Sequence, residues 1–161
     1  MTKMMTILSV ALLCASVAHA DMPKEGQYDY SACWAGTSNV TKFSDKQSII
    51  STDFTGIVRT ATPGGPFDGE TFHCTGLSMW VDGKPTSDTT FCIATDKDGN
   101  KRLARFTNNN GTVTREHLAG TGKYEGMTLT PTAVKPMGPF PTAKPGTFQG
   151  CNHQTGSYKL K

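Results

Sequence analysis

The sequence predicts an all-β protein, a single small antiparallel β-barrel of about eight to nine strands. Three observations predict this fold. No stretch of the chain sustains the apolar period of a helix. Short runs rich in β-branched and aromatic residues alternate with Gly, Pro, Asn and Asp turn signals. Cysteines also lie in the first and last of these runs, so a disulfide between them would close the sheet and remove its exposed edges.

Residues 1–20 have the pattern of a secretory signal peptide, which leaves residues 21–161 as one β-barrel domain. Lys3 precedes an apolar run over residues 7–15, and Ala18-His19-Ala20 is a small-x-small cleavage site. No later stretch is apolar enough to span a membrane. Without Lys3 the formal net charge falls from +3 to +2, which gives no electrostatic reason to bind nucleic acid. We therefore expect an exported protein, secreted or periplasmic, with no nucleic-acid partner and no membrane span.

The cysteines of the predicted mature chain point to a disulfide framework. An even number of cysteines in an exported chain predicts two disulfides. The alternative is a metal site, because His73 adjoins Cys74 and His153 lies two residues after Cys151. No Cys-x-x-Cys pair supports that alternative, so we expect neither a metal nor another cofactor. The cysteines assigned to disulfides are Cys33, Cys74, Cys92 and Cys151.

The outer parts of the chain supply the first and last strands. The first two strand candidates cover residues 28–36 and 49–60, and a turn near residues 51–53 is expected to break the second. The Thr-Pro-Gly-Gly-Pro sequence that follows is a loop, because proline fixes φ and glycine favours turns. The last strand candidates cover residues 147–151 and 155–160.

Residues 70–81 and 88–95 are predicted to form a hairpin whose register can be tested by parity. Its apolar residues occupy odd positions in both strands, so they share a face only when paired residue numbers add to an even value. The two-residue Asp-Gly turn alone gives an odd sum, and a longer loop or a bulge restores an even one. An even sum can place Cys74 opposite Cys92, within disulfide range. This pairing, which leaves the first cysteine to bond to the last, is favoured; the other two connectivities remain open.

A second hairpin is predicted between residues 101–107 and 112–119. The Asn-Gly sequence at residues 110–111 is a strong signal for a tight hairpin turn. With these two residues as the loop, three favourable cross-strand pairs form at once. The pairs are Thr107 with Thr114, Arg105 with Glu116, and Leu103 with Leu118.

Two connecting segments allow more than one interpretation. Residues 96–100 alternate acids before a glycine as a calcium loop does, but a further ligand and a later Glu are missing, so a plain Asp-Gly turn is predicted. Residues 131–146 contain five prolines, which predicts an extended polyproline-like segment outside the sheet. A rigid strap that closes one end of the fold is favoured there over a recognition motif.

Residues 119–126, Ala-Gly-Thr-Gly-Lys-Tyr-Glu-Gly, resemble the Gly-Thr-Gly-(Lys/Arg)-aromatic-x-Gly turn of the allene oxide cyclase and dirigent β-barrel superfamily. Exported bacterial members with a similar Cys-rich end are the more similar ones. The resemblance implies an antiparallel, lipocalin-like barrel, often oligomeric, whose lumen holds an apolar or amphipathic molecule. No cyclase or dirigent site residue matches a position here, and the four cysteines and the proline-rich segment depart from the plant members.

The function that these patterns favour is binding of a small apolar molecule inside the barrel. One face of the second hairpin mixes aromatic and basic residues and would line the lumen or its mouth, while two further aromatics offer stacking surfaces. The alternative is that the basic residues point to solvent, as charges on antiparallel sheets usually do. The candidate ligand-binding residues are Phe106, Arg115, His117, Trp80 and Tyr124.

Two other function classes are weighed against binding. An isomerase or cyclase would need a general base, for which His117, His73 and Glu116 are the candidates. No hydrolase, zinc-protease or phosphate-loop signature accompanies them, and oxidised cysteines are poor nucleophiles, so the sequence favours a non-enzyme. A structural or surface-interaction protein is the third class.

Overall fold

A computed structural model describes residues 22–138, 140–142 and 144–161, and the predicted signal peptide lies outside the described residues. The described chain contains eight β-strands and one short 3-10 helix, η1, at Gly122–Tyr124. The strands are β1 (Glu25–Lys42), β2 (Gln47–Thr60), β3 (Thr71–Val81), β4 (Lys84–Thr95), β5 (Lys101–Asn109), β6 (Thr112–Gly120), β7 (Thr128–Met137) and β8 (Thr147–Lys159).

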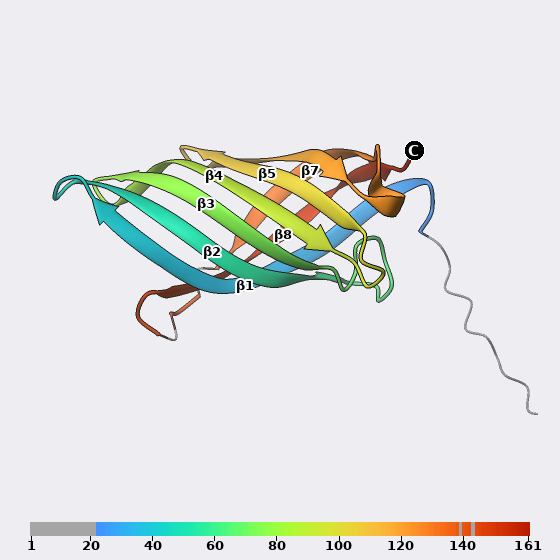
Figure 1. Cartoon of the computed structure of the whole chain (residues 1–161), viewed down its shortest axis with the longest axis horizontal. Coiled ribbons are helices and arrows are strands. Elements are labelled where there is room, and N and C mark those ends of the chain that lie inside the picture. Colours follow the sequence, from blue (N-terminus) through green and yellow to red (C-terminus); the bar gives the residue numbers. More distant parts are fainter. Residues whose placement is uncertain (1–21, 139, 143) are drawn as a thin grey trace, which may run out of the picture.

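All eight strands belong to one antiparallel sheet, in the order β6-β5-β4-β3-β2-β1-β8-β7. The two outer strands, β6 and β7, approach each other without pairing, so the sheet curls into a nearly closed barrel (Figure 1). The first strand pairs with the last, β1 with β8. The predicted all-β barrel is therefore confirmed.

Both predicted disulfides are present, Cys33–Cys151 and Cys74–Cys92. Cys74 lies directly opposite Cys92, and a register shift between Met79 and Trp80 lets this pairing coexist with a two-residue turn. The parity argument thus identified the right pairing, and of its two ways to reach an even sum, a longer loop or a bulge, the structure shows the bulge. The apolar odd-numbered face of this hairpin points outward: Leu77, Met79, Phe91 and Ile93 are exposed.

Several element predictions are wrong, for identifiable reasons. β2 runs unbroken through residues 51–53, because it pairs with β1 on one side and β3 on the other. β8 is likewise one strand. β7 occupies part of the segment that was expected to lie outside the sheet, because an edge strand needs ladder donors on one side only and Pro131 lies at its register shift. Leu103 faces Ala119 instead of Leu118, because a bulge shifts the register.

The turn at residues 96–100 is the predicted plain turn. The Asp96 carboxylate accepts hydrogen bonds from the backbone N–H groups of Asp98, at 2.9 Å, and Asn100, at 2.8 Å. The ammonium of Lys123 lies 2.8 Å from the same carboxylate. A lysine from η1 therefore holds the position that a bound cation would need.

The two ends of the barrel differ. The hairpin end carries the turns β1–β2, β3–β4 and β5–β6; the packed end carries the β2–β3 loop (residues 61–70), the turn at 96–100 and η1 (Figure 1). At the packed end the loop inserts Phe67, at φ 70°, between strand residues. The Phe67 ring lies 5.5 Å from that of Tyr158 and 5.7 Å from that of Tyr28. This cluster forms the hydrophobic core.

A buried ion pair completes the packed end. Arg102 donates from Nε to Oε1 of Glu70 at 3.1 Å, and its Nη2 contacts the other carboxylate oxygen. The hydroxyl of Tyr124 donates to Oε1 of Glu70 at 2.8 Å. The Arg102 guanidinium carbon also lies 4.0 Å from the Phe67 ring centre. Burial raises the pKa of Tyr124, and the charge of Glu70 raises it further, so Tyr124 stays a neutral donor.

Candidate functional site

A cavity of about 340 Å³ occupies the barrel interior between the packed end and the hairpin end. Inward-facing side chains from all eight strands line it. Its volume lies in the range of small-molecule sites. The large apolar side chains among the lining are Trp34, Phe54, Phe72, Phe106 and Phe148.

Aromatic rings form one wall of the cavity. The ring centre of Phe54 on β2 lies 5.7 Å from that of Trp34 on β1 and 5.5 Å from that of Phe148 on β8. Trp34 lies across Gly150, where a Cβ atom would come within 2.8 Å of the indole. Glycine on β8 therefore leaves the space that the indole occupies.

A polar chain crosses the end of the cavity that borders the core. Nη1 of Arg115 donates to the Tyr30 hydroxyl at 2.8 Å, and that hydroxyl donates to Oε1 of Gln154 at 3.0 Å. Nε2 of Gln154 then donates to Oδ1 of Asn152 at 2.8 Å. Arg115 is only 8% exposed, and its Nε has no hydrogen-bond partner among the described residues. The hydrogen bond from Nη1 thus holds the guanidinium in place, while its Nε–H remains an unused donor.

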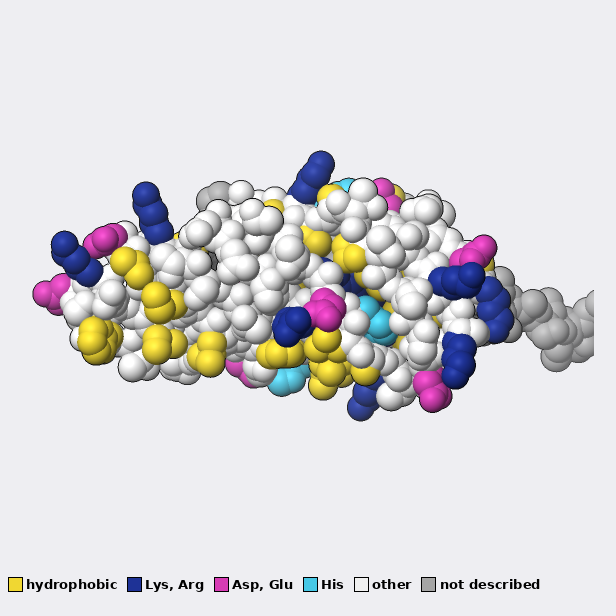
Figure 2. Space-filling model, turned by 90° about the horizontal axis from the view of Figure 1, so that it is seen from above, with side chains coloured by type: hydrophobic (Ala, Val, Ile, Leu, Met, Phe, Trp, Pro, Cys, Tyr) yellow, Lys and Arg dark blue, Asp and Glu magenta, His cyan; other side chains and the backbone are white. Residues whose placement is uncertain are grey.

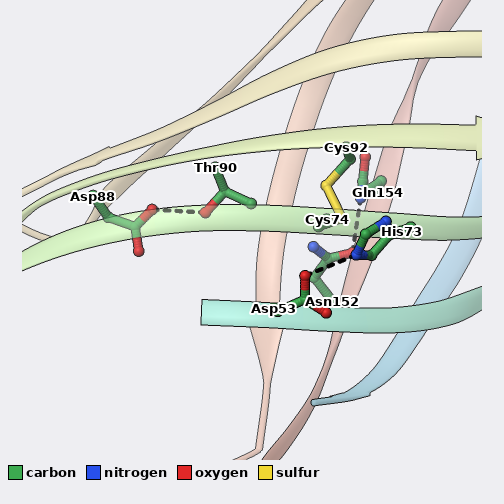
Figure 3. The surroundings of a disulfide bond; sticks show 8 residues. All are labelled: Asp53, His73, Cys74, Asp88, Thr90, Cys92, Asn152 and Gln154. Atoms are coloured by element: carbon green, nitrogen blue, oxygen red, sulfur yellow. Dashed lines mark hydrogen bonds and ion pairs between the residues drawn. A yellow bond between two sulfur atoms is a disulfide. The ribbon is translucent and has the colours of Figure 1, made fainter. Parts of the chain in front are cut away.

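The Cys74–Cys92 disulfide (Figure 3) and an acid also line the cavity, with Cys74 directly across from Phe54 on the neighbouring strand. Asp88 lies nearer the hairpin end than Cys92 on the same strand, and accepts a hydrogen bond from Oγ1 of Thr90 at 3.0 Å. Burial raises the pKa of Asp88, against the opposing effect of that hydrogen bond. The cavity therefore has a cationic group beside the core and an acid toward the hairpin end.

Two of the five predicted ligand-binding residues, Phe106 and Arg115, line the cavity. Trp80 lies near the β3–β4 turn, where its Nε1 donates to Oγ of Ser78 at 2.9 Å. Tyr124 is buried at the packed end, bonded to Glu70. Neither Trp80 nor Tyr124 is among the lining residues.

His117 lies beside the cavity residues without lining the cavity itself. Its Nδ1 is buried without a hydrogen-bond partner in the described structure. Burial, together with the nearby charges of Arg102 and Arg115, lowers the pKa of His117 to about 4. The imidazole is therefore neutral at pH 7.

The other residues weighed for catalysis are on the outer surface. Nε2 of His73 lies 2.9 Å from Oδ2 of Asp53, and both side chains are exposed (Figure 3). Glu116 forms an exposed ion pair with Arg105, the surface pair expected from the sequence. The buried position of Arg115 rules out the alternative that it points to solvent.

Sequence reasoning missed much of the cavity lining. Trp34 follows Tyr28, Tyr30 and Ala32 at alternate positions of one strand, and this period of two could have placed it inward. Asp88 could have been found by extending the inward face of Cys92 along the same strand. Phe148 carried no comparable signal, because the alternate positions that follow it on β8 are Gly150, Asn152 and Gln154, which are not apolar.

No protein-family model, curated protein or solved structure matches the chain. Within the described residues, no three metal-ligating side chains lie close enough together to hold a metal ion. The described part of the chain also contains no helix that is long and apolar enough to cross a bilayer.

Proposed function

We propose that this barrel binds one apolar or amphipathic small molecule in its lumen. The observation that carries the proposal is the cavity of about 340 Å³, whose lining combines a wall of aromatic rings with a few oriented polar groups. This combination is typical of small-molecule sites, where apolar area supplies affinity and a few polar groups set orientation.

The distribution of side-chain size on β3 and β4 supports this function. Between the Cys74–Cys92 disulfide and the hairpin end, the inward positions include Gly76, Ser78, Asp88 and Thr90. These small and polar side chains do not fill the interior, whereas Leu77, Met79, Phe91 and Ile93 of the same strands point outward. Figure 2 shows hydrophobic side chains gathered on the outer surface. A packed core would have the opposite arrangement.

Calorimetric titration with short alcohols, fatty acids and bicyclic aromatic compounds tests the proposal. We expect saturable binding of at least one of these classes. Val113→Trp places a large ring in the cavity and should weaken binding at least tenfold, whereas Thr112→Trp changes the adjacent exposed position and should not. Absence of binding by every class, or equal effects of the two variants, would refute a luminal site.

We also infer that the protein acts outside the cytoplasm, secreted or periplasmic. Its two disulfides are compatible with an oxidising compartment, and residues 1–20 have the pattern of a cleavable signal peptide. The proposal predicts that the exported protein begins at Asp21. Mass spectrometry of the secreted or periplasmic fraction checks this, and an intact N-terminus in a cytoplasmic fraction would contradict it.

The relationship to the allene oxide cyclase and dirigent superfamily is likewise proposed. It is supported by the position of residues 119–126, which end β6 and form η1 at one corner of an eight-stranded antiparallel barrel. Gly120 permits close packing there, since a Cβ atom would lie 2.1 Å from the backbone oxygen of Tyr124.

A further inference from the structure

We propose that the ligand is an organic monoanion, most simply a carboxylate on an apolar body, and that its charged head binds Arg115 at the end of the cavity beside the core. This inference rests on the proposed function, because it assigns the chemistry and orientation of the molecule in the lumen. It follows from three features: a buried cation with unused donors, an apolar wall next to it, and an acid at the other end.

The buried cation is incompletely satisfied by the protein. A guanidinium has five N–H donors, whereas the protein groups that face Arg115 are neutral hydroxyls: that of Tyr30, 2.8 Å from Nη1, and that of Tyr28 beside it. No ion pair joins Arg115 to a carboxylate of the described chain. Arg102, which is similarly buried, binds Glu70 through two nitrogens. A buried charge without a counter-ion is unfavourable, so the carboxylate that Arg115 lacks is the group that a ligand would supply.

The surroundings hold Arg115 in an orientation suited to that role. The Tyr30 hydroxyl accepts a hydrogen bond from Arg115 and donates one to Gln154, which in turn donates to Asn152. Every bond in this chain points away from the guanidinium, so the chain fixes Arg115 without neutralising it. Carboxylates prefer the planar donor geometry of arginine, and such charge-assisted bonds are the stronger ones.

The remaining cavity sets the direction of the ligand. The Phe106 ring centre lies 5.7 Å from the guanidinium carbon of Arg115, and the ring cluster of Trp34, Phe54 and Phe148 provides the apolar wall. Asp88 lies toward the hairpin end and would repel an anionic head placed there. In the proposed bound state the anionic head therefore lies at Arg115 and the apolar body lies against the aromatic wall.

Three probes that share one tail and differ in the head test the inference: octanoate, 1-octanol and octylammonium, each titrated calorimetrically into the purified protein. We expect octanoate to bind at least tenfold more tightly than 1-octanol, with octylammonium the weakest. This series needs no altered protein, so it does not depend on whether a variant folds. Equal affinity for octanoate and 1-octanol would overturn the inference and leave the proposed function standing, whereas no binding by any probe would count against both.

A variant pair then locates the head. Arg115→Gln should abolish the preference for octanoate while leaving the affinity for 1-octanol within about threefold, because only the head loses its partner. Arg105→Gln removes an exposed arginine of the neighbouring strand and should leave both affinities unchanged. Retention of the octanoate preference in Arg115→Gln would show that the anion binds elsewhere.

Discussion

Arg102 and Arg115 lie on neighbouring strands and face the same barrel interior, yet the protein treats them differently. Arg102 is 2% exposed and bonded to Glu70, which also receives the Tyr124 hydroxyl. Arg115 is 8% exposed, and among the described residues its polar partners are the neutral hydroxyls of Tyr30 and Tyr28. Both side chains line the cavity. The charge of Arg102 is paired with a carboxylate, although its Nη1 has no hydrogen-bond partner in the described structure, whereas Arg115 has no carboxylate partner there.

This contrast separates a structural half of the barrel from a functional half. At the packed end, the β2–β3 loop fills the interior with Phe67 and the tyrosines around it. Toward the hairpin end, small and polar inward residues leave the interior unfilled. A protein selected only for stability would be expected to fill such space, because cavities and unpaired charges both destabilise the fold.

The largest expected effect on stability comes from removing a disulfide. Replacing Cys33 and Cys151 by alanine removes a link across 118 residues and should lower the free energy of unfolding by about 5 kcal/mol. Replacing Cys74 and Cys92 removes a link across 18 residues and should cost about 3 kcal/mol. Urea denaturation measures both free energies of unfolding. A greater loss on removing Cys74–Cys92 than on removing Cys33–Cys151 would contradict the chain-entropy explanation.

Breaking the network of the packed end should have the next largest effect. Glu70→Gln leaves Arg102 buried without its counter-ion and should cost about 3–5 kcal/mol of unfolding free energy. Glu116→Gln breaks an exposed arginine pair and serves as the control, with an expected loss below about 1 kcal/mol. Similar losses in the two variants would remove the distinction between buried and surface pairs.

The pH dependence of stability tests the effect of both arginines on one residue, His117. Burial and the positive charges of Arg102 and Arg115 all disfavour its protonation. Its pKa is about 4 in the fold and about 6.5 in the unfolded chain, so between these values the unfolded state binds the extra proton. The unfolding free energy should therefore fall as pH decreases from about 6.5 to 4. Asp88 acts in the opposite sense, because burial raises its pKa.

Comparing the protein with His117→Asn isolates the histidine contribution. The slope of unfolding free energy against pH, measured by urea denaturation at several pH values, should be flatter in the variant over that window. An unchanged slope would mean that His117 titrates alike in the folded and unfolded states.

The smallest expected effect is the most informative for the functional half. Arg115→Met removes a charge that forms no ion pair with a carboxylate of the described chain. The unfolding free energy of the ligand-free protein should therefore change by less than about 1 kcal/mol. Arg102→Met should instead cost several kcal/mol, roughly as Glu70→Gln does, because it strands Glu70. Losses of equal size would make Arg115 a structural residue.

Local rules were sufficient to predict some parts of this molecule. Parity placed Cys74 opposite Cys92, and the Asn-Gly turn set the pairs Arg105–Glu116 and Thr107–Thr114. Period two also put Phe106 and Arg115 on one face. These inferences need only neighbouring strands, where the alternation of side chains is decisive.

Other features depend on information that neighbouring strands do not contain. Trp80 and Tyr124 lie at different heights along the barrel from Arg115, and height follows from the stagger of all eight strands. β7 accepted its prolines because it is an edge strand, a property of the whole sheet. The cavity is equally global: apolar alternation on β3 and β4 marks the outer face here, so it could not indicate the interior.

The central claim, that the hairpin half of the barrel is a ligand site, is tested most directly by the fluorescence of Trp34, which lines the cavity. In Trp80→Phe this indole is the remaining tryptophan of the protein. Titration with octanoate should produce a saturable change in its emission, and the Trp34→Phe variant, which retains Trp80, should show little change. An unresponsive Trp34, or a response of Trp80 alone, would contradict a luminal site.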